Sequence, residues 1–275
     1  MRTRSLLFGP AQRTDFVAKF VACGADIGCL DLEDATPITA KADARSALAD
    51  ARPGAADLGT MRLFVRVNAL DFGQLEDDLA AAAAAHISGV VVPKVESASD
   101  IGSIRAAMSA AGLANAELCA GIESAVGVVR AAEIAEAQVD LLYFGAEDYI
   151  TDLGGVRTTS NDEVLMARSQ VALAARVGNV VALDQVVVDF ADDERFVSEA
   201  NMARAIGYGG KMCIHPSQVP LANTAFTPTE KELTWAKGVL AAAADAEAAG
   251  AGVFSYEGAM VDAPIIARAR RILRR

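Results

Sequence analysis

The chain has 275 residues, of which 53% are hydrophobic and 22% are charged, so it can bury a large core and is not intrinsically disordered. Its net charge of −11, without a basic stripe before the last few residues, argues against a nucleic-acid-binding protein. No run reaches the roughly 18–20 apolar residues of a membrane span, and the cysteines form no C-x-x-C pair, which favours a cytoplasmic protein with reduced thiols.

Eight short apolar segments predict buried strands, at 5–10, 27–33, 62–68, 89–94, 117–123, 141–148, 180–187 and 211–215. Several of these segments are apolar throughout, as in Val90-Val91-Val92, instead of alternating between polar and apolar residues. Continuous apolar runs are typical of strands that are buried on both faces of a parallel sheet.

Helical patterns separate these strands. We predict helices over 14–23, 75–86, 100–111, 125–137, 161–177, 192–206 and 229–250. Gly178 and Gly207 follow two of them, a favoured position for glycine after a helix. The segment 256–264 is predicted to be a loop or lid that leads into a last short helix.

This alternation predicts an α/β protein with a (β/α)₈ TIM barrel over residues 1–225, followed by a C-terminal helix and lid segment over 226–275. A doubly wound open sheet is the alternative. No Gly-x-Gly-x-x-Gly motif follows the first strand, which argues against dinucleotide binding.

Polar residues gather at the C-terminal ends of the predicted strands. The residues concerned are Asp31, Glu33, Asp34, Arg66, Lys94, Glu123, Glu147, Asp148, Asp184, Gln185 and His215. In a barrel these ends converge on one face, where active sites are built. The pattern therefore predicts an enzyme.

Two apolar runs end on acids, Glu123 and Asp148, and carboxylate oxygens are the ligands that Mg²⁺ prefers. Either acid could instead cap the helix that follows it. Among Asp31, Glu33 and Asp34, two side chains could hold water on a metal. The same three acids could also form a solvated turn.

Arg66 is flanked by apolar residues at a strand end, so it needs an anionic partner, either a structural carboxylate or a substrate oxyanion. Lys94 either attracts phosphate groups or pairs with Glu96. We interpret His215 as a hydrogen-bonded packing group, not as a base.

Several motifs together resemble the citrate lyase β-subunit-like group of the HpcH/HpaI aldolase superfamily, which includes malyl-CoA and citramalyl-CoA lyases. They run in order through nearly the whole chain: RSLLFGP at 4–10, LDLEDA at 30–35, RVN at 66–68, PKVE at 93–96, IESA at 122–125, FGAED at 144–148, GKMCIHPSQ at 210–218 and MVDAP at 260–264.

The resemblance implies a Mg²⁺-dependent lyase that cleaves a 3-hydroxyacyl-CoA, of the citramalyl-CoA or malyl-CoA type. The products are an acyl-CoA such as acetyl-CoA and a 2-keto acid such as pyruvate or glyoxylate. It implies that Glu123 and Asp148 bind the metal, that Glu123 also meets the substrate, and that Arg66 stabilises the enolate oxygen.

The resemblance also implies a homotrimer or homohexamer. In that assembly the segment 226–275 packs on a neighbouring subunit, and Asp262 acts there as acid and base. Under this interpretation Glu33 and Asp34 support the metal's waters.

Other functions stay open at this stage. The chain could be the β-subunit of an acyl-carrier-protein-dependent citrate lyase, or a malyl-CoA thioesterase in which the same site activates water. A non-catalytic, ligand-sensing barrel is disfavoured because Arg66, Glu123, Asp148 and Asp262 are all present.

Overall fold

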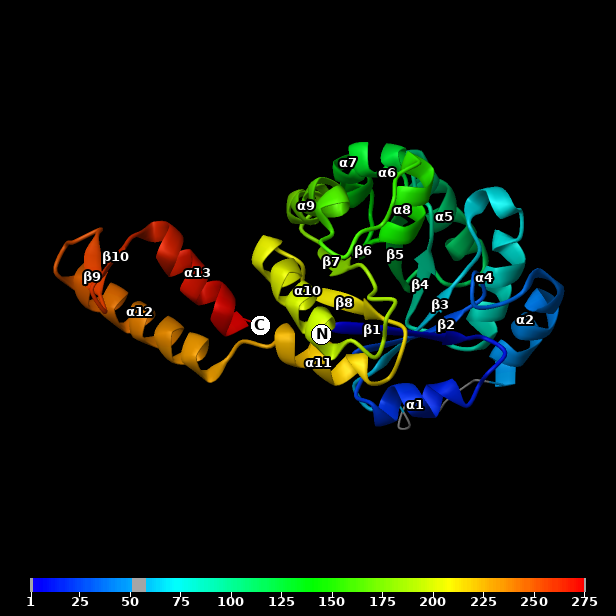
Figure 1. Ribbon diagram of the computed structural model, residues 1–275, viewed down its shortest axis with the longest axis horizontal. Coiled ribbons are helices and arrows are strands. Elements are labelled where there is room, and N and C mark those ends of the chain that lie inside the picture. Colours follow the sequence, from blue (N-terminus) through cyan, green and yellow to red (C-terminus); the bar gives the residue numbers. More distant parts are fainter. Residues whose placement is uncertain (1, 51–57, 275) are drawn as a thin grey trace. The chain divides into compact units, whose positions relative to one another are not determined.

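The computed structural model describes residues 2–50 and 58–274, and it confirms the TIM barrel. Eight parallel strands close in chain order, with β1 next to β8 (Figure 1). The strands are β1 (Ser5–Pro10), β2 (Ile27–Asp31), β3 (Arg62–Arg66), β4 (Gly89–Val92), β5 (Glu117–Ile122), β6 (Leu141–Phe144), β7 (Val181–Asp184) and β8 (Gly210–Cys213).

Helices surround this barrel (Figure 1). They are α1 (Phe16–Ala22), α2 (Lys41–Asp50), α4 (Leu75–Ala84), α5 (Ala98–Ala110), α6 (Ala125–Val129), α7 (Ala131–Glu136), α8 (Ala146–Leu153), α9 (Asp162–Val177), α10 (Asp193–Ile206) and α11 (Gln218–Ala225), with 3₁₀ turns at Ile38–Ala40 and Leu70–Phe72. Of these, α2, α8 and α11 were not predicted from the sequence.

The strands are apolar throughout because each strand separates two packed layers. Side chains such as Leu6, Phe64 and Tyr143 fill the barrel interior. Their sequence neighbours, such as Leu7 and Leu63, pack against the surrounding helices. Alternate side chains point to opposite faces of a strand, so burial of both faces removes any polar alternation.

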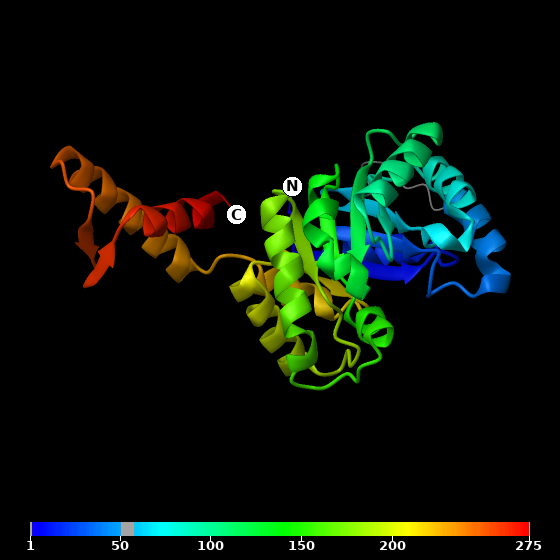
Figure 2. The same cartoon turned by 90° about the horizontal axis from the view of Figure 1, so that it is seen from above.

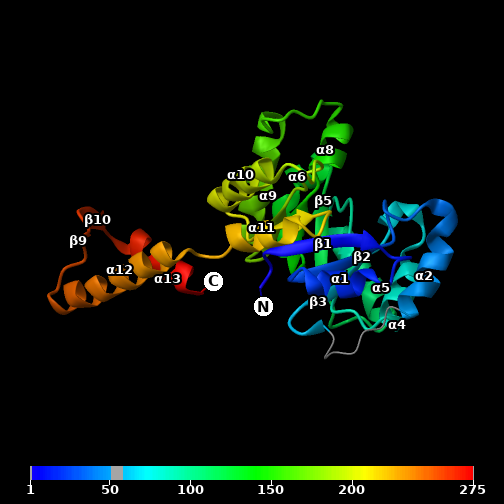
Figure 3. The same cartoon turned by 60° about the horizontal axis from the view of Figure 1, so that its bottom comes forward.

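Helix α1 lies along β1 and β2 at close range (Figure 3). Its Phe20 ring fills the space over two glycines of these strands. A Cβ atom on Gly28 would lie 2.3 Å from the Phe20 ring, and one on Gly9 would lie 2.9 Å from it. The two glycines therefore allow an aromatic helix residue to seal this side of the barrel.

Two predicted elements have different boundaries in the structure. The sixth strand was predicted to reach Asp148, but it ends at Phe144, and Gly145 starts helix α8. The predicted helix 125–137 is two helices, α6 and α7. The chain turns between them at Arg130, whose backbone angles of φ −97° and ψ 7° are not helical.

The chain from Thr227 onward forms a second compact unit. Its helices α12 (Glu230–Ala248) and α13 (Ala263–Arg274) lie side by side (Figure 2). A two-stranded antiparallel hairpin, β9 (Phe254–Tyr256) and β10 (Ala259–Val261), connects them where a loop was predicted. The last helix is 12 residues long, not short.

Across residues 2–50 and 58–274, none of the helices combines the length and apolar composition needed to cross a bilayer.

Candidate active site

Two adjoining cavities lie where the strands end, and they share two acids. The larger has a volume of about 550 Å³ and is lined by Arg66 and Tyr143 among others. The smaller, of about 470 Å³, is lined by Lys94. Glu123 and Asp148 line both cavities, so the structure brings the two predicted metal ligands together.

Glu123 directly follows β5 and is only 4% exposed. Its Oε2 accepts a hydrogen bond from the backbone N–H of Lys94 at 3.0 Å. Gly145 leaves room for the carboxylate, because a Cβ atom there would lie 2.4 Å from Oε1. Burial raises the pKa of Glu123 to about 7, and the nearby charges of Glu33 and Asp148 add to the shift.

Asp148 lies in the first turn of helix α8, not at the end of a strand. A carboxylate in a first helical turn interacts favourably with the helix dipole. The alternative that Asp148 caps the helix is nevertheless wrong, because the N-cap is Gly145 and no side chain makes a capping hydrogen bond there. The side chain faces the cavities, and its Oδ1 lies 3.6 Å from the ammonium of Lys94.

Lys94 lies among the acids. Its ammonium is 3.3 Å from Glu33 Oε1 as well as 3.6 Å from Asp148 Oδ1. The predicted pairing with Glu96 is wrong, because the Glu96 carboxylate accepts a hydrogen bond from Ser124 at 2.6 Å. The backbone of Lys94 has φ +54°, a left-handed conformation that is unfavourable for this residue and is often retained at functional sites.

Arg66 ends β3, and its partner is a structural carboxylate. It donates to both carboxylate oxygens of Asp31, at 2.8 and 2.6 Å, and it lies 2.7 Å from Glu33. The guanidinium also lies over the Phe8 ring, 4.7 Å from its centre. Although these contacts hold Arg66 in place, it lines the larger cavity and remains available to a ligand.

The acids after β2 do not form a solvated turn as a group. Asp31 is buried and accepts hydrogen bonds from the backbone N–H groups of Glu33 and Ala35 at 2.9 and 3.0 Å. Glu33 is also buried, which raises its pKa. The Asp34 side chain is 65% exposed and lies 3.8 Å from Arg66. A role of Glu33 and Asp34 in holding metal-bound water stays a prediction.

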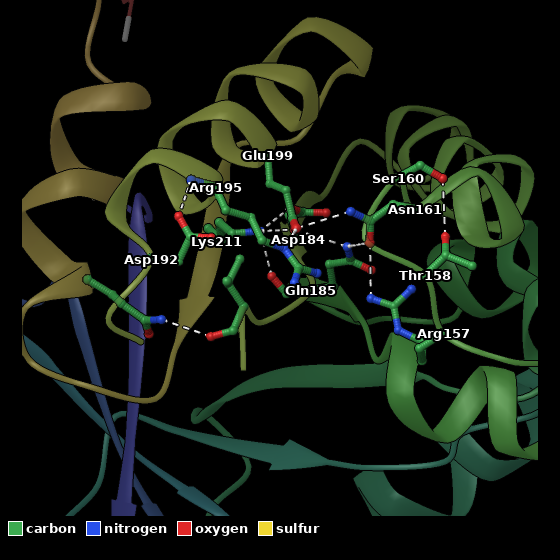
Figure 4. Close-up of polar contacts among 12 residues, drawn as sticks. Arg157, Thr158, Ser160, Asn161, Asp184, Gln185, Asp192, Arg195, Glu199 and Lys211 are labelled. Atoms are coloured by element: carbon green, nitrogen blue, oxygen red, sulfur yellow. Dashed lines mark hydrogen bonds and ion pairs between the residues drawn. The ribbon is translucent and has the colours of Figure 1, made fainter. Parts of the chain in front are cut away.

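Asp184 and Gln185 are not part of this site, which corrects the prediction from strand ends. The Asp184 carboxylate is fully buried and binds Arg168 and Lys211, each at 2.6 Å. Gln185 binds Asn161 at 2.8 Å. Figure 4 shows Asp184, Gln185, Asn161 and Lys211 within one polar network. Asp184 points away from the barrel interior, because its neighbour Leu183 points into it.

Two other predicted residues make hydrogen bonds with residues close to them in the chain. His215 is exposed, contacts Ser217 Oγ at 2.8 Å and stacks on Phe190, as expected for a hydrogen-bonded packing group. Asp262 lies in the C-terminal unit at the start of α13, where its Oδ1 accepts a hydrogen bond from the N–H of Ile265 at 3.4 Å. Its catalytic role stays a prediction.

The chemistry of the site fits a hard cation. Within residues 2–50 and 58–274, no three His, Cys, Asp or Glu side chains are arranged to hold a metal ion. A cation between Glu123 and Asp148 would therefore keep sites for water or ligand, as Mg²⁺ usually does. Burial and the charge of Glu33 raise the pKa of Glu123, so a bound cation would favour its ionised form.

The chain is similar to known proteins over nearly its whole length. Residues 4–216 match the family described as HpcH/HpaI aldolase/citrate lyase. The chain is 48% identical to the citrate lyase subunit beta-like protein of Deinococcus radiodurans, over 98% of this chain and 96% of that protein. It is 28% identical to the mitochondrial citramalyl-CoA lyase of Rattus norvegicus, over 98% of this chain and 85% of that enzyme.

A solved structure agrees with these similarities. The crystal structure of the CitE protein from Mycobacterium tuberculosis, in complex with magnesium, acetoacetate and coenzyme A, is 36% identical to this chain. It superposes with a TM-score of 0.83 and covers 98% of this chain and 96% of its own.

Proposed function

The chain belongs to the HpcH/HpaI aldolase/citrate lyase family, and on this premise we propose that it is a magnesium-dependent carbon–carbon lyase acting on a 3-hydroxyacyl-CoA. The substrate is of the citramalyl-CoA or malyl-CoA type, and the products are an acyl-CoA and a 2-keto acid. One observation carries the proposal: Glu123, Asp148 and Arg66 line the same cavity.

Glu123 and Asp148 are the residues that would hold Mg²⁺. The ion, when bound, lowers the pKa of the substrate hydroxyl and neutralises the keto-acid oxygens. The similarity to a structure that contains magnesium, acetoacetate and coenzyme A supports this assignment. Lys94 maintains the geometry of the pair, because its N–H binds Glu123 and its ammonium lies near Asp148.

Arg66 supplies the other half of the chemistry. The C3 hydroxyl loses its proton to solvent, and its oxygen becomes the carbonyl of the keto acid as the bond between C2 and C3 breaks. The electron pair of that bond moves onto the thioester and gives an enolate. A guanidinium beside the enolate oxygen stabilises that charge. Because Asp31 and Glu33 already fix the guanidinium, little reorganisation is needed during the reaction. Asp262 then gives a proton to the enolate carbon.

A panel of thioesters tests the proposed reaction. Malyl-, citramalyl-, β-methylmalyl- and 3-hydroxy-3-methylglutaryl-CoA would each be incubated with the protein and Mg²⁺. We expect release of a keto acid and an acyl-CoA from the malyl- or citramalyl-type substrates. Release of free coenzyme A without a keto acid would identify a thioesterase and overturn the lyase proposal.

Replacing Asp262 by asparagine should stop cleavage while leaving binding of Mg²⁺ and keto acid unchanged. The amide keeps the shape of the side chain but cannot exchange a proton with the enolate carbon. Asp245→Asn, an exposed acid on helix α12, is the matched control and should keep full activity. Normal turnover by Asp262→Asn would show that this acid is misassigned.

We also propose that Asp262 serves a neighbouring subunit within a homotrimer or homohexamer. This arrangement predicts complementation between two inactive variants, Asp262→Asn and Glu123→Gln. Mixed oligomers formed by coexpression should regain activity, because some sites then combine an intact Asp262 with an intact Glu123 from different chains. Mixed oligomers without activity would place both residues of one site in the same chain.

The pKa of Glu123 predicts how magnesium affinity depends on pH. The ion binds the ionised carboxylate, and the folded protein holds a proton on Glu123 up to about pH 7. Affinity should therefore rise by about tenfold per pH unit from pH 5 toward 7 and then level off. Titration calorimetry with MgCl₂ measures this slope; the same affinity at pH 5.5 and pH 7.5 would contradict it.

A second candidate function is the β-subunit of a citrate lyase complex. Similarity to the citrate lyase beta subunits of Leuconostoc mesenteroides and Escherichia coli, at 35% and 36% identity, favours it. In that case the chain should copurify from its source with carrier-protein and transferase subunits and should act on a carrier-bound substrate. Turnover of a free acyl-CoA by the purified chain alone would favour the first candidate.

A further inference from the structure

We propose that the buried hydroxyl of Tyr143 positions the Glu123 carboxylate for metal binding. The inference rests on the proposed function. Tyr143 belongs to β6, and nothing in its sequence surroundings, which are apolar, distinguishes it from a core residue. Its importance follows from how β5 and β6 are paired.

The two strands place the two side chains next to each other in register. Gly121 of β5 pairs with Tyr143 of β6. The hydrogen bonding between the two strands continues beyond their C-terminal ends, because the N–H of Gly145 donates to the carbonyl of Ile122 at 3.1 Å. Glu123 is two residues after Gly121, and Gly145 is two residues after Tyr143. Residues two apart point to the same face of a strand, so Tyr143 lies one layer below Glu123.

Each of these large side chains occupies the space left by a glycine on the other strand. A Cβ atom on Gly121 would lie 2.5 Å from the Tyr143 hydroxyl oxygen. A Cβ atom on Gly145 would lie 2.4 Å from Glu123 Oε1. The sequence Gly121-x-Glu123 therefore interlocks with Tyr143-x-Gly145, and the hydroxyl is held directly beneath the acid.

The Tyr143 hydroxyl has no hydrogen bond although it is buried. The residue is 1% exposed, and among the described residues its oxygen finds no partner with hydrogen-bond geometry. Burial and the charge of Glu123 raise the pKa of Tyr143 well above its ordinary value. A hydrogen-bonding interaction with Glu123 adds to this shift in pKa, so the two groups are close enough to interact although the pair does not reach standard hydrogen-bond geometry.

Leaving a buried hydroxyl unpaired costs about 1–3 kcal/mol, so a protein usually avoids it. Tyr208 shows the usual solution, since its buried hydroxyl donates to the carbonyl of Arg168 at 2.8 Å. At Tyr143 the nearby acceptor is Glu123, whose Oε2 already accepts from the Lys94 N–H. A second donor would fix the plane of the carboxylate, the kind of support that metal ligands commonly receive.

The test compares two buried tyrosines, with Tyr143→Phe as the probe and Tyr208→Phe as the control. Magnesium affinity is measured by titration calorimetry, and thermal stability is measured in EDTA. Tyr143→Phe should bind Mg²⁺ about tenfold more weakly or worse, while its melting temperature in EDTA stays unchanged or rises, because an unpaired hydroxyl is removed. Tyr208→Phe should melt lower but bind Mg²⁺ like the wild type.

The possible outcomes separate the inference from the proposed function. If the wild type binds Mg²⁺ and Tyr143→Phe binds it equally well, the inference is wrong and the lyase proposal stands. If the wild type binds no Mg²⁺, both are wrong.

Discussion

Replacing Glu123 by glutamine is expected to abolish magnesium-dependent cleavage while leaving the protein folded. The ion contributes several kcal/mol to the transition state, so its loss should lower turnover by roughly 10³-fold. Glutamine keeps the size of the side chain and still accepts the N–H of Lys94, but it lacks the charge that holds the cation. Coupled assay of keto-acid release and calorimetry with MgCl₂ both measure the effect.

The matched control lies on the same strand. Glu117 begins β5 at the opposite end of the barrel and pairs with Arg62 at 2.6 Å. Glu117→Gln removes an acid of the same type from the N-terminal face of the barrel, where residues contribute to stability and not to catalysis. It should keep full activity and magnesium affinity. Near-normal turnover by Glu123→Gln, or by the wild type in EDTA, would refute the metal site.

The second large effect is expected for Arg66→Lys, which should lower kcat by about 10²–10³-fold, the usual size for loss of one donor to an oxyanion. An ammonium cannot bind both oxygens of Asp31 and also reach Glu33 as the planar guanidinium does. Because Arg66 is not a metal ligand, magnesium affinity should stay close to that of the wild type. Steady-state kinetics and calorimetry separate the two effects.

Arg62→Lys is the corresponding control, since Arg62 begins the strand that Arg66 ends. Its guanidinium is also largely buried and pairs with the carboxylate of Glu117. This variant should lose stability without losing kcat. If Arg66→Lys resembles Arg62→Lys in both measurements, Arg66 has a structural role only.

The barrel could be predicted from the sequence because each strand is a short apolar run followed by a helical pattern. Strand ends were less predictable. The run that ends at Phe144 continues into Gly145, which is disfavoured in strands and helices alike and so does not show which of them follows, and no side chain caps the start of α8. The helix break at Arg130 has no proline or glycine at the turn itself and was therefore missed.

The site was only partly predictable, because sequence position does not state which face of a strand a residue occupies. Glu123, Asp148 and Arg66 were expected at one cavity, and they line it. Asp184 also ends a strand, but it points outward to Arg168. When both faces of a strand are buried, the apolar pattern cannot distinguish these cases. Tyr143 was missed because its proposed role depends on Glu123, which lies beside it only when β5 and β6 pair.

The network around Lys211 also constrains how this barrel can be recombined with that of a relative. Lys211 of β8 and Asp184 of β7 are fully buried, while Arg168 comes from α9 and Glu199 from α10. A chimera that exchanges only one of these elements with a mismatched residue leaves a buried charge unpaired, at a cost of about 3–5 kcal/mol. Crossover points therefore belong outside residues 161–211, and this quarter of the barrel should be exchanged as one block.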